Sequence, residues 1–154
     1  MARVLIVGCG CRGQGLAREL VAAGHAVRGT TRDPAKVDAI AAAGAEPYVG
    51  DPDRIGTLMG AVAGTTVVCW LLGTAEAPDL HAGRLRMLFE KLVDTPVRGV
   101  VYEPAATDPE GGLAIAAAAH ETWLIPFAVL DADPTDPVAW LASATRAVEG
   151  LLSG

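Results

Sequence analysis

Residues 3–15 read RVLIVGCGCRGQG, an apolar run that passes directly into a glycine-rich loop. Residues 4–7 are too few and too rich in β-branched side chains for a helix, so they predict a buried strand. Beyond the loop, apolar residues recur at helical spacing over residues 16–23, and Gly24 follows where a C-terminal cap is expected. The stretch therefore predicts a strand, a tight turn and a helix in immediate succession.

The same alternation of strand-length apolar runs and helical periodicity continues along the chain. Parallel pairing with right-handed crossovers is the simplest arrangement of such units, and it covers both faces of a sheet. We therefore expect one α/β domain over residues 1–154, with a doubly wound, Rossmann-type parallel sheet of six strands and helices on both faces. The predicted strands are 4–7, 25–31, 47–49, 65–72, 97–102 and 123–130, and the helices that follow them are 16–23, 33–44, 51–63, 80–93, 113–119 and 137–152.

Composition narrows the class of protein. The chain has 154 residues, of which 51% are hydrophobic and 19% charged, which excludes disorder. No apolar run approaches the ~20 residues of a membrane span. The net charge of -6 argues against nucleic acid or an anionic membrane surface as a partner. Three cysteines are too few for a disulfide framework or a zinc site, and we expect no leader before the first strand, so the predicted location is cytoplasmic.

The charge is unevenly distributed along the chain. Residues 1–77 hold seven basic and seven acidic side chains, whereas residues 78–154 hold five and eleven. An anionic ligand should therefore prefer the first half.

The glycine loop carries the strongest chemical signal. Gly8, Gly10 and Gly13 form a Gly-x-Gly-x-x-Gly pattern between a predicted strand and a predicted helix. Gly8 permits the tight turn, Gly10 lets the backbone approach a pyrophosphate, and Gly13 lets helix and strand pack closely. Backbone N–H groups and the helix dipole then hold the phosphates. A purely structural turn is the alternative. The loop residues predicted to contact a dinucleotide are Gly8, Cys9, Gly10, Cys11, Arg12 and Gly13.

The end of the second strand indicates which dinucleotide is preferred. Thr31 lies near the position where NAD-specific sites carry an acidic residue for the ribose 2′-hydroxyl, and it cannot act as a carboxylate. Arg32 follows and can pair with a 2′-phosphate, although a solvated surface charge is the alternative. Asp33 precedes Pro34 and is typical of a helix cap, though it could contact the ribose instead. NADP is therefore favoured over NAD.

At these positions the chain resembles a known family. The Gly-Cys-Gly-x-x-Gly loop, the Gly24-His25-x-Val27 segment, the Thr-Arg-Asp-Pro turn and Gly50-Asp51 are similar to the NAD(P)-binding domains of atypical and extended short-chain dehydrogenases. The NAD-dependent epimerase/dehydratase and NmrA-like groups are the most similar, over residues 3–75.

The resemblance also implies roles for residues beyond the loop. It implies that Asp51 hydrogen-bonds the exocyclic amine of adenine, with Pro52 packed nearby. Asp51 is equally typical of a helix cap, and both roles can hold together. It further implies that Leu71, Leu72 and Gly73 line the path of the pyrophosphate and nicotinamide ribose.

The chain departs from the family at the catalytic motif. Members of the superfamily use a tyrosine with a lysine four residues later. Here Tyr48 and Tyr102 are followed at that spacing by Pro52 and Ala106, so the motif is absent. The weak catalytic candidates that remain are Tyr102 and Glu103 as proton donors at the end of the fifth strand, and His81 as an acid/base. The alternatives are a sheet-edge or interface role for the first two, and an exposed or capping position on a first helical turn for His81.

Other chemistry-bearing residues favour structural roles. Asp131, Asp133 and Asp136 alternate with prolines and are typical of turns and N-caps rather than of a cation site, so no metal is predicted. Cys9 and Cys11 lie in a positive field that could lower a thiol pKa and gate cofactor binding, but a tight loop also simply needs small residues. Trp123 and Trp140 are predicted to pack in the interior or at a dimer surface.

Two functional hypotheses lead. The first is a small NADP(H)-binding, oxidoreductase-like or epimerase-like protein that acts on a small-molecule substrate, alone or as a homodimer. The second is a non-catalytic NADP(H)-binding sensor or regulatory module. A doubly wound scaffold that binds no nucleotide is the third possibility, because fold alone does not assign function.

Overall fold

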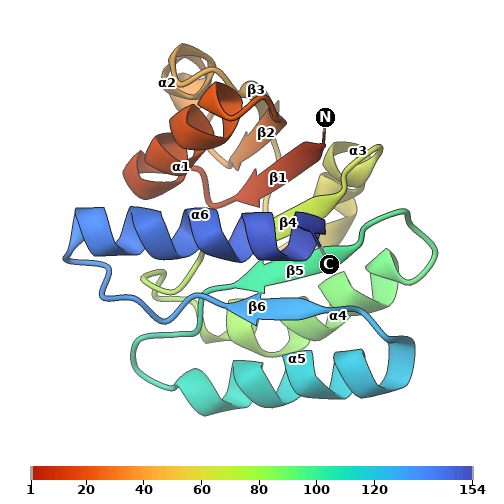
Figure 1. Cartoon of the computed structure of the whole chain (residues 1–154). Helices are drawn as coiled ribbons and strands as arrows, with labels where there is room; N and C mark the ends of the chain where they lie inside the picture. Colours follow the sequence, from red (N-terminus) through yellow and green to blue (C-terminus); the bar gives the residue numbers. More distant parts are fainter. Residues whose placement is uncertain (1, 154) are drawn as a thin grey trace.

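A parallel sheet of six strands organises the computed structural model, which describes residues 2–153. The strand order is β3-β2-β1-β4-β5-β6, and every neighbouring pair is parallel (Figure 1). The strands are β1 (Arg3–Val7), β2 (Ala26–Thr31), β3 (Glu46–Val49), β4 (Val67–Trp70), β5 (Gly99–Tyr102) and β6 (Phe127–Val129). The α-helices are α1 (Cys11–Ala22), α2 (Val37–Ala42), α3 (Met59–Val62), α4 (Gly83–Leu92), α5 (Pro109–Trp123) and α6 (Pro137–Ser153), and three 3₁₀ turns are η1 (Pro34–Lys36), η2 (Ile55–Leu58) and η3 (Pro78–His81).

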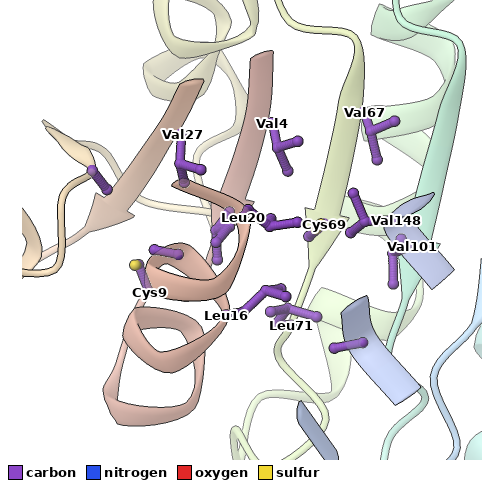
Figure 2. Close-up of a cluster of buried hydrophobic side chains, with 14 of the residues drawn as sticks. Val4, Cys9, Leu16, Leu20, Val27, Val67, Cys69, Leu71, Val101 and Val148 are labelled. Carbon is purple, nitrogen blue, oxygen red and sulfur yellow. The ribbon is translucent and has the colours of Figure 1, made fainter. Parts of the chain in front are cut away.

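Helices cover both faces of the sheet, which confirms the doubly wound prediction. One core packs α1, α2 and α6 against the sheet, and the other packs α3, α4 and α5 against the opposite face (Figure 1). Alternate residues of each central strand supply the two cores: Val4 and Ile6 of β1 enter the first, and Leu5 and Val7 the second. Figure 2 shows the first core, where side chains of α1 and α6 meet the sheet at Leu16, Leu20, Val148, Val4, Cys69 and Val101.

Two predicted elements differ from the structure because local interactions prevail. Residues 51–63 form a turn, η2 and the one-turn helix α3 instead of a single helix. The Asp51 carboxylate accepts from the Asp53 N–H at 2.9 Å, and the Thr57 hydroxyl accepts from the Asp51 N–H at 2.8 Å. These side-chain bonds compete with helical backbone pairing.

The second difference concerns the segment before β6. The prediction of a strand from residue 123 was wrong, because α5 extends to Trp123 and ends at Leu124 with a left-handed φ of 57°. Alanine has the highest helix propensity of all residue types. The alanine run within α5 therefore favours continuation of the helix beyond the predicted residue 119. The other strands lie within two residues of their predicted ranges, whereas α1 begins five residues before the predicted residue 16 and the predicted helix 33–44 divides into η1 and α2.

The strand order reverses between β1 and β4, which are hydrogen-bonded neighbours leading to opposite sides of the sheet. Loops after these strands diverge there, and open α/β sheets bind ligands at this point. Within residues 2–153, no helix has the length and apolar character needed to cross a bilayer.

We predict opposite effects for one substitution at two glycines near this point. A Cβ at Gly29 of β2 would lie 2.6 Å from Cys9 Sγ, so Gly29→Ala should lower the free energy of unfolding by about 1–3 kcal/mol. Gly15 lies inside α1 with nothing within 4 Å of its added Cβ, so Gly15→Ala should raise that free energy by about 0.5–1 kcal/mol. Urea denaturation measures both, and changes of equal sign would contradict this packing of Gly29 and Gly15.

Candidate functional site

The glycine loop is shaped by two close backbone approaches. Gly8 has a φ of +89°, and a Cβ there would lie 2.6 Å from the Leu71 carbonyl oxygen. A Cβ on Gly13 would lie 3.1 Å from the Gly8 carbonyl oxygen, so α1 packs directly against the turn that precedes it. Gly10 has nothing within 4 Å of its Cβ position. Gly8 and Gly13 therefore serve the fold, while Gly10 leaves the loop surface open to a ligand.

The N-terminus of α1 is available to an anion. No side chain caps Gly10, and no acidic residue lies in the first turn of α1. The Gly10 N–H donates to the Gly8 carbonyl at 2.9 Å, and the next N–H groups have no intrahelical acceptor. These groups and the helix dipole give the loop a positive potential, and no carboxylate within the first turn of α1 opposes it.

Two cavities meet at the glycine loop and share Gly8, Gly10 and Leu72, and we call them together the loop cleft. The first cavity lies toward β2, and its other lining residues are Cys9, Thr30, Thr31, Arg32, Lys36 and Pro52. The second lies toward β4, and its other lining residues are Cys11, Arg12, Gly13, Leu71, Thr74 and Ala75. The loop cleft thus brings together every residue predicted to contact a dinucleotide except Asp51 and Gly73.

Two cations line the cavity near β2. Arg32 and Lys36 are exposed, and among the described residues none forms an ion pair or side-chain hydrogen bond with either. Arg28, also on β2, is different, because its buried guanidinium bonds to Glu46 and to the Ala61 carbonyl. Arg28 is a structural arginine, whereas Arg32 and Lys36 present unpaired charge to the cavity.

The acidic residues beside this cavity cap turns. Asp33 accepts from the Ala35 N–H at 2.9 Å and caps η1, as its position before Pro34 predicts. Asp51 caps the turn before η2 with one carboxylate oxygen, and Pro52, next to it, is buried and lines the cavity. One oxygen of each carboxylate is thus engaged by backbone.

A buried carboxylate holds the other end of the cleft together. Glu103, directly after β5, is 4% exposed and forms two hydrogen bonds with the Arg12 guanidinium, one of 3.0 Å. It also accepts from the Gly73 N–H at 2.9 Å and from the Trp140 indole N–H at 2.8 Å. The Arg12 guanidinium lies over the Trp140 ring, 4.6 Å from its centroid. We call Arg12, Glu103, Gly73 and Trp140 the carboxylate cluster.

The carboxylate cluster sets the protonation state of Glu103. Burial alone would raise the pKa of Glu103, but hydrogen bonds from Arg12 and Trp140, the Arg12 charge and the Gly73 N–H together lower that pKa. Glu103 is therefore ionised at neutral pH and accepts four hydrogen bonds, so in this arrangement it has no proton to donate.

Comparison with known proteins places the chain in a family. Residues 8–108, more than half of the chain, match the model of a family described as NAD(P)H-binding. The chain belongs to the NAD(P)H-binding family. The family region spans the glycine loop, Arg32, Asp51, Leu72 and Glu103, and therefore the whole loop cleft. No curated protein matches the chain.

Solved structures of NAD(P)-binding Rossmann proteins share the fold. Triphenylmethane reductase from Citrobacter sp., solved in complex with NADP(H), is 21% identical with a TM-score of 0.66, over 86% of this chain and 50% of that one. Anaerobillin reductase from Escherichia coli O157:H7 is 12% identical with a TM-score of 0.65, over 83% and 71%. Vestitone reductase from alfalfa (Medicago sativa L.) is 14% identical with a TM-score of 0.62, over 84% and 56%. The chain thus spans about half the length of the triphenylmethane reductase.

Tyr102 and His81 form a buried pair behind the loop cleft. The Tyr102 hydroxyl lies 2.6 Å from His81 Nδ1, and His81 Nε2 lies 2.9 Å from the Leu72 carbonyl oxygen. Because that carbonyl can only accept, Nε2 carries the proton and Tyr102 donates to Nδ1. Burial raises the pKa of Tyr102 to about 12. The pair is therefore linked to the loop cleft by the hydrogen bond of His81 to the backbone of Leu72, which lines both cavities of the cleft.

The expectation of an exposed or capping His81 was wrong. His81 is 6% exposed and ends η3, and the non-helical backbone at Ala82, with φ of -134° and ψ of -107°, separates η3 from α4. The Trp70 indole N–H donates to the Leu80 carbonyl at 2.8 Å and holds η3 against β4. That break in the helix turns His81 toward Tyr102.

Cys9 and Trp140 each follow the structural one of the two alternatives that the sequence offered. Burial raises the pKa of Cys9 to about 11, so the loop's field does not activate this thiol, and Cys9 instead fills the space beside Gly29. Trp140 is buried within the described chain and therefore does not form an exposed dimer surface, whereas Trp123 is 37% exposed.

The acidic residues after β6 form a turn and a helix cap. Asp133 accepts from the Thr135 N–H and Asp136 accepts from the Ala139 N–H, which confirms the predicted turn and cap. Within residues 2–153, no group of three or more metal-ligating side chains is arranged to hold a metal.

The sequence reasoning missed Lys36 and the role of Trp140. Lys36 stands four positions after Arg32, behind the Asp33-Pro34 cap, and this spacing could have placed both cations at one helix start. Trp140 is 37 positions from Glu103, and no sequence pattern links them.

We predict that Glu103 stabilises the folded protein most at pH values at which its carboxyl group is ionised. A lowered folded-state pKa means that this stabilisation is present above the ordinary value of 4.5 and is lost as pH falls through the folded value. Glu103→Gln should therefore lower the free energy of unfolding by about 1.5–3 kcal/mol at pH 7, and by progressively less below pH 4.5. Chemical denaturation across pH measures the difference. Glu90→Gln, on the exposed face of α4, is the matched control and should show no such change.

Proposed function

We propose that the loop cleft binds NADP(H) in preference to NAD(H). The observation that carries this proposal is the unpaired Arg32 and Lys36 lining the same cavity as Thr31, with no acidic lining residue among those described. A 2′-phosphate carries close to two negative charges, which two cations can match, whereas NAD offers only hydroxyls there. The NADP(H) complex of the Citrobacter triphenylmethane reductase supports the same preference.

The proposed contacts follow the length of the cleft. Gly8, Cys9, Gly10, Cys11, Arg12 and Gly13 would hold the pyrophosphate through backbone N–H groups and the α1 dipole. Thr31, Arg32 and Lys36 would hold the 2′-phosphate, and Asp51 and Pro52 the adenine. Leu71, Leu72 and Gly73 would line the nicotinamide ribose. When bound, the reduced dinucleotide supplies a hydride.

For the chemistry, we propose an oxidoreductase-like protein that reduces a small molecule. Three structural neighbours named as reductases support this choice. Tyr102 and His81, hydrogen-bonded to each other, stay the candidate acid/base residues, whereas Glu103 is held as an anion and stays a candidate only as a base. The chain's own residues would bind and orient the reactants and exclude water around them.

A non-catalytic NADP(H) sensor is the second candidate function. The missing Tyr-x-x-x-Lys motif and the fully engaged Glu103 favour it. A sensor would bind the dinucleotide with the same residues and transmit its binding state through the carboxylate cluster.

The proposed location is cytoplasmic, because the three cysteines are free thiols. A homodimer stays a proposal that the exposed Trp123 supports.

Removing the Arg32 charge tests the cofactor preference. Arg32→Ala should weaken NADPH binding about 10- to 150-fold and leave NADH binding unchanged, because only NADPH carries the 2′-phosphate. Lys36→Ala should act in the same direction. Isothermal titration calorimetry at equal salt measures both. Arg86→Ala, an equal charge loss on exposed α4, is the control, and unchanged discrimination in Arg32→Ala would refute the assignment.

A methyl group at Gly10 tests the loop itself. Gly10→Ala should change the free energy of unfolding by less than about 0.5 kcal/mol, since nothing lies within 4 Å of the new Cβ. The same methyl group should weaken dinucleotide binding at least about tenfold by blocking approach of the pyrophosphate. Gly83→Ala, equally open but at the start of α4, should leave binding intact. Wild-type affinity in a folded Gly10→Ala protein would place the dinucleotide elsewhere.

A further inference from the structure

We propose that a pocket beyond the carboxyl ends of β5 and β6 binds an apolar organic cation, and we call it the β5–β6 pocket. This inference rests on the proposed function, because the pocket adjoins the loop cleft and would hold the molecule to be reduced. Thr74 lines both the pocket and the cleft, and Glu103 of the pocket wall bonds to Arg12 of the cleft.

The walls of the β5–β6 pocket are mostly apolar and stiff. They come from the loop after β5, the start of α5 and the turn after β6. The principal apolar contributions are Pro104, Ala105, Leu113, Val129, Leu130 and Pro134. A proline restricts the backbone of each of these three segments, so the pocket is largely preformed and suits a rigid, weakly hydrated ligand.

The charge of this pocket is negative. Its ionisable lining residues are Glu103 and Asp131, and it has no Lys, Arg or His. Arg12 balances the Glu103 charge, whereas among the described residues no ion pair or hydrogen bond engages the Asp131 side chain. The loops that carry the walls, residues 103–113 and 129–136, hold further acids and no basic residue: Asp108, Glu110, Asp133 and Asp136. An anion would meet uncompensated repulsion here, and a cation would be attracted.

The β5–β6 pocket also lacks a proton donor among its described lining residues, and this favours a cationic hydride acceptor. Reduction of a carbonyl needs a proton for the oxygen as well as a hydride. Hydride transfer breaks one C–H bond of the reduced dinucleotide and forms one C–H bond at the cationic carbon. It leaves the oxidised dinucleotide and a neutral product, so no proton is required. Among the described residues lining the pocket, none is Tyr, Lys or His, and Glu103 is ionised. The pocket is thus suited to an iminium or carbocation-like acceptor with apolar substituents.

Equilibrium binding of two dyes tests this inference without turnover. The full chain, saturated with oxidised NADP, is titrated with a cationic triphenylmethane dye and with an anionic, sulfonated triphenylmethane dye. The cation should bind at least about tenfold more tightly at low salt, and the ratio should fall as salt screens the exposed acids. Asp131→Asn should lower the ratio about threefold. Asp94→Asn, an equal charge change on the exposed loop before β5, should not lower it.

A variant that fills the pocket locates the binding. Ala106 is exposed and lines the pocket, so Ala106→Phe should remove dye binding while NADPH binding, measured by calorimetry, persists. Equal affinity for both dyes, an equal effect of Asp131→Asn and Asp94→Asn, or full dye binding in a folded Ala106→Phe protein would each overturn the inference. Intact NADPH binding in those cases would leave the proposed function standing, whereas no NADPH binding by wild-type protein would overturn the proposed function itself.

Discussion

A buried carboxylate cannot stay ionised without donors, and Glu103 draws its donors from three separate segments. Arg12 comes from the glycine loop, Gly73 from the loop after β4, and Trp140 from α6. Each segment must therefore lie where its donor can reach one side chain at the end of β5, because an uncompensated buried charge is costly. The cavity of the loop cleft toward β4 is lined by Arg12 and by Thr74, the chain neighbour of Gly73, so two of its lining residues lie on segments that bond to Glu103.

The carboxylate cluster also separates two regions of opposite electrostatic potential, the β2 side of the loop cleft and the β5–β6 pocket. On the β2 side, Arg32 and Lys36 stand without counter-charges, so that end suits phosphate. On the β6 side, the Arg12 charge is cancelled by Glu103 and the neighbouring loops are acidic. The loop cleft and the β5–β6 pocket thus differ in potential, and Arg12 with Glu103 marks the boundary between them.

Much of the fold and the shape of the glycine loop follow from patterns that are local in sequence. The β-branched strands, the glycine loop and the Asp33-Pro34 cap each specify their structure within a few residues, and the doubly wound arrangement follows from their order. The short η2 and α3 could not be read in this way, because Thr57 and Asp51 form side-chain bonds that override the apolar spacing. His81 was misplaced for a similar reason, since its burial depends on Tyr102, 21 positions away. The bonds of Glu103 to Arg12 and Trp140 span 91 and 37 positions and need the folded sheet to exist.

The stacking of Trp140 on Arg12 places an intrinsic fluorophore at the edge of the loop cleft. Trp70 is sealed in the opposite core and Trp123 lies on the surface of α5, so Trp140 alone of the three indoles touches the cleft's boundary. A cation held against an indole face, together with a carboxylate on its N–H, sets the emission of that ring. A ligand that displaces Arg12 changes the contact of this cation with the indole face, so the fluorescence of Trp140 is expected to respond to events in the glycine loop.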